Sequence, residues 1–171
     1  TQEASVYRDL TVEENLLFRA RLYRPKEARA LVEEILSRFG LQPYARSLAG
    51  HLSGGWRQRL ALAQVVVHRP EVLFLDEPTT GLDPLSRRRI WDLIHQEAAR
   101  GAAVLVTTHY MDEAERCHRL ALLYGGRVLA TGTPQELKAL AQARARFLFV
   151  PGGSLEAVAA QSPGDAAEAV E

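Results

Sequence analysis

Apolar side chains recur at helical spacing through the first third of the chain. The run Thr11-Val-Glu-Glu14 has the form of a capping box and predicts a helix that starts there. A second amphipathic helix is predicted over residues 26–39, where Gly40 ends it, and a third from Ser53 to about His68, before Pro70. The first third is therefore expected to be helical.

Two continuous apolar runs of strand length follow. They cover residues 72–75 and 102–107, and a helical pattern over 84–99 separates them. Runs that are apolar at every position are typical of strands buried in a parallel sheet. The sequence therefore predicts a β-α-β unit, in which the two strands are parallel and buried.

The remaining elements are smaller. They are predicted in this order: a short helix over 111–117, a hairpin of strands 120–124 and 127–130, a helix that begins after Thr133, and a strand over 147–150. Gly125-Gly126 is a strong hairpin-turn signal, and Thr133-Pro-Gln-Glu136 is a second capping box with proline at the first helical position. The chain is thus expected to have an α/β fold.

Composition narrows the class of protein. The chain has 171 residues, 47% of them hydrophobic and 25% charged, which is typical of a folded globular domain. Lys plus Arg equals Asp plus Glu at 21 each, so the overall charge argues against a dedicated nucleic-acid binder. No apolar run reaches the roughly 18 residues that a membrane span needs.

Two single residues bear on the origin of the chain. Cys117 is the only cysteine, so it forms no internal disulfide, and with only His118 beside it no metal-site spacing results. Met111 is the only methionine, so Thr1 is not a translation start. We therefore expect the chain to be a fragment or a processed piece of a protein from a reducing compartment.

The first candidate site is the carboxylate pair Asp76-Glu77, which follows the first predicted strand directly. Open α/β sheets bind ligands at the carboxyl ends of their strands. One carboxylate can hold Mg²⁺ while the next accepts a proton from an attacking water. Alternatively, the two acids only cap the turn at Pro78.

Three further segments could contact phosphate. Ser53-Gly54-Gly55 lets a phosphate approach the start of a helix, although Ser53 could equally be an ordinary N-cap. His109 follows the second predicted strand and could donate to a phosphate oxygen, although a lone histidine is more often structural. Asp83 in Gly-Leu-Asp-Pro could simply cap the helix that follows it.

The four segments in this order resemble the ATP-binding cassette (ABC) family. LSGGW at 52 is similar to its signature motif, the strand leading into DEP at 76 to its Walker B motif, GLDP at 81 to its D-loop and TTH at 107 to its H-loop. Gln2 resembles the Q-loop glutamine. The stretches from residues 52 and 109 look most like ATP-binding subunits of ABC-2-type exporters, a group that includes drug efflux pumps.

The resemblance implies a P-loop NTPase-like cassette with four segments: a Q-loop at 1–10, a helical subdomain at 11–70, a catalytic core at 71–142 and the start of a C-terminal extension at 143–171. It implies ATP and Mg²⁺ as ligands and Glu77 and His109 as catalytic residues. The expected nucleotide and metal contacts are as follows: Gln2, Leu52, Ser53, Gly54, Gly55 and Asp83 for ATP, and Asp76 and Gln2 for Mg²⁺.

The chain departs from the family pattern in two ways. Trp56 stands where many members have glutamine, and nowhere does the chain contain the phosphate-binding loop G-x-x-x-x-G-K-[ST]. In the family that loop precedes the Q-loop, so truncation is the simpler explanation for its absence. The chain alone is therefore expected to be inactive.

The resemblance also implies partners and a location. Two cassettes sandwich ATP, and an ABC-2-type membrane-spanning permease receives the movement, so we expect a peripheral protein on the cytoplasmic face of the cell membrane. Two alternatives stay open at this point. The chain could belong to a soluble, non-transport ABC ATPase, or it could be a non-catalytic half-cassette that offers its signature motif to a partner.

Overall fold

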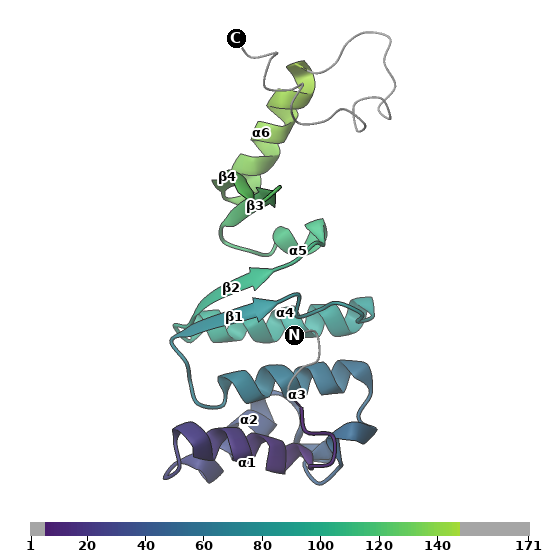
Figure 1. Ribbon diagram of the computed structural model, residues 1–171, viewed down its shortest axis with the longest axis vertical. Helices are drawn as coiled ribbons and strands as arrows, with labels where there is room; N and C mark the ends of the chain where they lie inside the picture. The colour runs from purple at the N-terminus through teal and green to yellow at the C-terminus, as the bar shows by residue number, and fades with distance from the viewer. Residues whose placement is uncertain (1–5, 148–171) are drawn as a thin grey trace. The chain divides into compact units, whose positions relative to one another are not determined.

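The computed structural model describes residues 6–147 and divides into two compact units, Thr1–His109 and Tyr110–Glu171 (Figure 1). The first unit contains, in chain order, α1 (Val12–Tyr23), α2 (Ala28–Arg38), the 3-10 helices η1 (Gln42–Tyr44) and η2 (Ala49–His51), α3 (Gly54–Val66), β1 (Val72–Asp76), α4 (Pro84–Ala99) and β2 (Ala103–Thr107). The second contains α5 (Met111–Ala114), β3 (Leu120–Tyr124), β4 (Arg127–Gly132) and α6 (Pro134–Phe147).

The start of α1 is fixed by local polar contacts. The predicted capping box is confirmed, because the Thr11 side chain accepts from the Glu14 N–H at 3.2 Å and Glu14 accepts from the Thr11 N–H at 2.8 Å. Asn15, which is fully buried, donates to the Tyr7 carbonyl and accepts from the Gln64 side chain at 3.1 Å. These bonds hold the segment before α1 and the helix α3 against α1.

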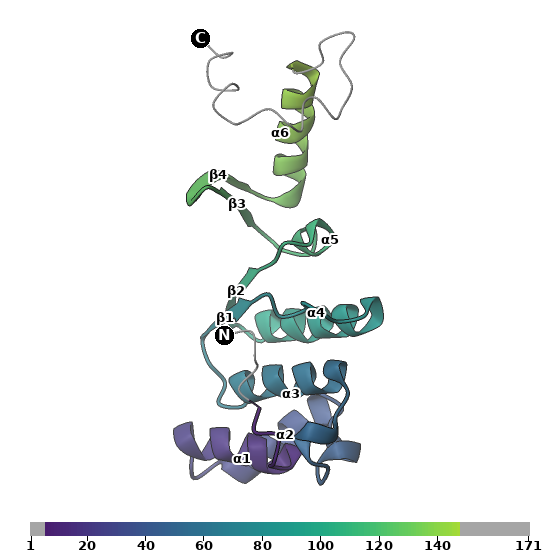
Figure 2. The same ribbon diagram turned by 45° about the vertical axis from the view of Figure 1, so that its right-hand side comes forward.

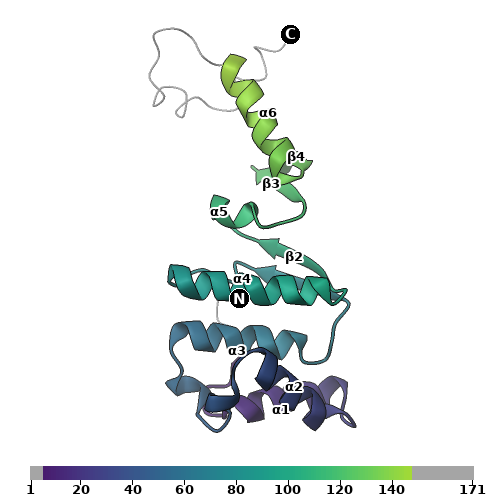
Figure 3. The same cartoon turned by 180° about the vertical axis from the view of Figure 1, so that it is seen from behind.

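The three helices α1, α2 and α3 share one apolar core. Its members lie at the helical spacing that the sequence showed, and each is at most 2% exposed: Val12, Leu16, Val32, Ile35, Phe39, Leu41, Leu60, Ala63, Val66 and Val67. In Figures 1, 2 and 3, α3 lies between the α1–α2 pair and α4. The helix that begins at Ser53 is therefore packed on both sides.

Strands β1 and β2 pair in parallel, as predicted, with Asp76 opposite Thr107. Helix α4 covers one face of the pair, where Leu73 is 4% exposed. The other face is open in the described part of the chain, since Phe74 is 75% and Leu105 60% exposed. The predicted burial of the two strands is therefore wrong for this second face. A two-stranded sheet with one helix on it has cover for one face only.

The second unit confirms the predicted hairpin. Strands β3 and β4 are antiparallel, and Gly125 and Gly126 both have positive φ, at 54° and 74°, which a tight hairpin turn requires. Thr133 and Glu136 form the second capping box, with bonds of 2.7 and 3.2 Å. The helix α6 continues to Phe147, so the strand predicted from that residue is wrong there. Its remaining positions, 148–150, lie outside the described residues.

Candidate active site

The parallel register brings the ends of β1 and β2 to one edge of the sheet. There the Thr107 hydroxyl donates to the Asp76 carboxylate, and the Glu77 N–H donates to the Thr107 carbonyl at 3.1 Å and to its hydroxyl at 3.0 Å. The predicted position of the two carboxylates at the carboxyl end of a strand is confirmed. From the neighbouring strand, Thr107 contacts the Asp76 carboxylate and the backbone of Glu77.

Glu77 faces His109 across this edge. The His109 Nδ1 atom lies 3.3 Å from Glu77 Oε1, and the Thr80 hydroxyl donates to Glu77 Oε2 at 3.0 Å. Both side chains remain open to water, with 37% of Glu77 and 53% of His109 exposed. A carboxylate held by two neighbours and still reached by water has the geometry of a general base.

The backbone of Glu77 is unusual. Its φ is +44°, a backbone conformation that residues other than glycine rarely adopt. Such a residue persists only where the surrounding structure holds it. The bonds from Glu77 to Thr107 and Thr80 therefore support a turn that the residue would not take by itself.

The glycine-rich segment forms the start of α3. Ser53 is the N-cap, exposed, and its side chain makes no capping bond to the helix. A Cβ on Gly54 would meet nothing within 4 Å, so this start is open to a ligand. A Cβ on Gly55 would lie 2.6 Å from the Ser86 Oγ and 3.2 Å from its Cβ, so α3 approaches α4 closely at Gly55. Leu52, by contrast, is buried at 7% exposure.

Trp56, the departure from the family pattern, packs within its own chain. Its ring centroid lies 4.6 Å from that of Tyr44, and the Arg59 guanidinium lies 4.4 Å above the Trp56 ring. Arg59 also donates to the Phe39 carbonyl at 3.1 Å. The indole therefore packs α3 against the segment after α2.

Asp83 caps α4. Its Oδ1 accepts from the Ser86 N–H at 3.0 Å, and hydrogen bonds from the Ser86 side chain and backbone lower the pKa of the Asp83 carboxyl. The capping role that the sequence left as an alternative is thus observed. Asp83 remains exposed, so capping leaves the residue accessible from outside.

Of the two predicted Mg²⁺ ligands, only Asp76 at the sheet edge lies in the described part of the chain. Among residues 6–147 no three His, Cys, Asp or Glu side chains cluster as metal ligands. Mg²⁺ in phosphate chemistry needs only one or two protein carboxylates, because phosphates and waters complete its shell. The exposed Asp76 carboxylate fits that requirement. Gln2, the other predicted ligand, lies outside the described residues.

Two residues at this edge, Thr107 and Thr80, are not among the predicted site residues. Thr107 was visible only as part of the TTH motif, and its contact with Asp76 depends on the strand register. Thr80 stands three residues after Glu77, a spacing at which a hydroxyl can reach back within one turn. That spacing was the one signal that could have identified it.

Known proteins resemble this chain over most of its length. The family model described as "ABC transporter" matches residues 1–80. The chain is 46% identical over 140 residues to a probable multidrug ABC transporter ATP-binding protein, YbhF, of Escherichia coli (strain K12). The chain belongs to the ABC transporter family. It is also 48% identical over 132 residues to the Nod factor export ATP-binding protein I of Burkholderia thailandensis.

The ABC relatives are longer than this chain. The two alignments cover 81% and 75% of the chain but only 24% and 43% of the relatives. A solved structure of an ABC transporter ATP-binding subunit superimposes with a TM-score of 0.70 at 30% identity, covering 91% of this chain and 63% of that one. A second, cbiO1 from Clostridium perfringens, gives 0.72 at 30% identity, with 86% and 60% covered. The predicted cassette fold is confirmed.

Proposed function

We propose that this chain is part of the ATP-hydrolysing subunit of an ABC-2-type exporter, which couples hydrolysis to efflux of a small molecule such as a drug. The observation that carries the proposal is the Glu77–His109 pair beside Asp76 at one sheet edge. Relatives named for multidrug transport and for Nod factor export support the direction of transport.

Hydrolysis at this edge would use Glu77 as the base. Water attacks the γ-phosphorus, its proton passes to the Glu77 carboxylate, and the bond to the bridging oxygen breaks so that ADP leaves with the electron pair. His109 would donate to a γ-phosphate oxygen, while Glu77 acts on the attacking water. Asp76, and with it Gln2, would hold Mg²⁺, which supplies positive charge against the phosphate oxygens.

A second cassette would complete each ATP site. The open turn at Ser53 and Gly54 would contact the nucleotide held by the partner, with Leu52 and Gly55 shaping that turn. Asp83 would reach toward the other site. Because the sequence has no G-x-x-x-x-G-K-[ST], the phosphate-holding loop must come from outside this chain. The 171-residue chain by itself should therefore bind ATP weakly and not hydrolyse it.

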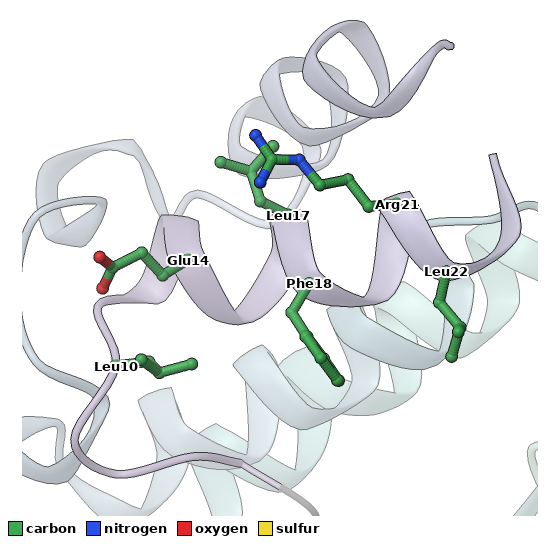
Figure 4. A pocket seen from close by; sticks show the side chains of 6 residues that line it. All are labelled: Leu10, Glu14, Leu17, Phe18, Arg21 and Leu22. Atoms are coloured by element: carbon green, nitrogen blue, oxygen red, sulfur yellow. The ribbon is translucent and has the colours of Figure 1, made fainter. Parts of the chain in front are cut away.

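The permease would dock on the helical region. A pocket of about 440 Å³ opens along α1 (Figure 4). Phe18 and Leu22 project from the same side of the helix and are 48% and 63% exposed. Exposed apolar side chains beside a pocket suit a partner helix. No helix among residues 6–147 could span a membrane. We place the subunit at the cytoplasmic face, bound through this pocket.

The test is Glu77→Gln in the complete subunit that carries this chain. Turnover should fall by about a hundredfold or more, because the amide accepts no proton, while ATP binding remains. Glu71→Gln, at the opposite end of β1, is the matched control and should leave turnover unchanged. Full turnover in Glu77→Gln would contradict the assignment of the base.

A further inference from the structure

Gln58 connects two parts of the candidate site. It lies in α3, one turn after the glycine-rich start, and its Nε2 donates to the Pro78 carbonyl at 2.7 Å. Pro78 follows Glu77 directly and is buried. The helix that begins at Ser53 therefore holds the turn that carries the proposed base.

This bond is costly to lose. A buried carbonyl without a donor costs more than the bond itself contributes. The turn is also supported by the Thr80 N–H to the Glu77 carbonyl at 3.2 Å, by the Leu82 N–H to the Thr79 carbonyl at 3.2 Å, and by the bonds of Glu77 to Thr107 and of Thr80 to Glu77. Since Glu77 has a φ of +44°, its carboxylate direction depends on those supports and on Gln58.

A second contact joins the same helix to the first turn of α4, just after this segment. Gly55 approaches Ser86 so closely that an added Cβ would lie 2.6 Å from the hydroxyl oxygen. Helix α3 thus contacts the connection between β1 and α4 at Pro78, and the first turn of α4 at Ser86. Because α3 contacts the chain on both sides of this segment, a displacement of α3 would act on the segment at both ends. With a single contact, the segment could rotate about that contact instead.

We propose that Gln58 is a positioning residue for Glu77, acting through the Pro78 carbonyl, and that it makes the direction of the base depend on the position of α3. The proposal rests on the proposed function, in which Glu77 is the base. A ligand that contacts the start of α3 then adjusts the base within the same chain. The signature segment and the base would be linked inside one subunit as well as across a dimer.

The experiment compares Gln58→Met and Gln58→Glu in the complete subunit. Both keep the approximate volume and remove the donor. We expect kcat to fall about tenfold, the KM for ATP to stay within about twofold, and the acid limb of the kcat–pH profile to shift. Gln96→Met and Gln96→Glu, at an exposed glutamine of α4, are the matched controls and should change none of these. Unchanged kcat in both Gln58 variants overturns the proposal.

A second measurement separates positioning from loss of folding. In the 171-residue chain, amide hydrogen exchange at Thr80 and Leu82 should accelerate in Gln58→Met, while exchange in the core of α1 stays as in the parent. Equal exchange at Thr80 overturns the proposal, and so does faster exchange throughout the chain. If Glu77→Gln is fully active, the proposed base is wrong whatever Gln58 does. If Glu77→Gln is inactive and Gln58→Met fully active, only the positioning role fails.

Discussion

The helical region and the two-stranded sheet bury their apolar residues to very different degrees. Phe39, at the end of α2, is 1% exposed, whereas Phe74, in the middle of β1, is 75% exposed. Helices α1, α2 and α3 find their partners within one continuous stretch of chain. A strand presents two faces, and α4 covers only one face of this pair. The helical region therefore buries most of its apolar residues among its own helices, whereas one apolar face of the sheet stays exposed in the described part of the chain.

Charged residues connect the helical region to α4. Glu34 of α2 accepts from Arg38 at 3.2 Å, from Arg69 at 2.5 Å and from Arg100 at 2.7 Å, and Arg38 also pairs with the buried Glu97 of α4. The hydrogen bond from Arg69 is the main cause of the lowered pKa of Glu34. This network joins the helical region to α4.

The largest expected difference in stability is between two variants, in each of which one phenylalanine is replaced by alanine. Phe39→Ala should lower the free energy of unfolding by about 3–5 kcal/mol, because it removes a packed ring and leaves a cavity. Phe74→Ala should change it by less than about 0.5 kcal/mol, because the ring is mostly in water already. Urea unfolding of the chain, followed by circular dichroism, measures both. Comparable losses would mean that something covers Phe74 in solution.

The next largest effect is expected at the buried ion pair. Glu97→Ala should cost about 2–4 kcal/mol, because Arg38 then remains buried with less compensation. The matched control is Glu115→Ala, which breaks an exposed pair with Lys138, 2.8 Å apart, and should cost at most about 0.5 kcal/mol. A loss at Glu97 no larger than at Glu115 would mean that the network does not stabilise the joint with α4.

The smallest effect concerns pH. Burial, and then the charges of Arg19 and Arg24, lower the pKa of His68 below its ordinary 6.5, and its ring stacks 4.2 Å from Tyr23. The unfolded chain therefore binds the proton first, so stability should decrease as the pH falls from 6.5 toward the folded-state pKa and level off below it. His68→Phe keeps the stack and should flatten this part of the curve in urea unfolding. An unchanged slope would assign the pH dependence to other groups.

Sequence reasoning succeeded where contacts are local. Both capping boxes, at Thr11 and Thr133, were predicted and observed, since they need only residues three apart. It failed at Phe147, where the apolar run 147–150 suggested a strand but α6 continues through its first residue. Where a helical pattern runs directly into an apolar run of strand length, the sequence pattern does not decide at which residue the helix ends.

The sequence by itself predicted that the pair Asp76-Glu77 and the residue His109 each follow one of two parallel strands, at the carboxyl ends of those strands. It also determined the order of the motifs, from which the family could be named. Only the tertiary structure decided that Thr107 and Thr80 hold the carboxylates, that Glu77 takes a positive φ, and that Gln58 reaches Pro78. Those contacts depend on register and helix packing, which are set by interactions between residues that are remote along the chain.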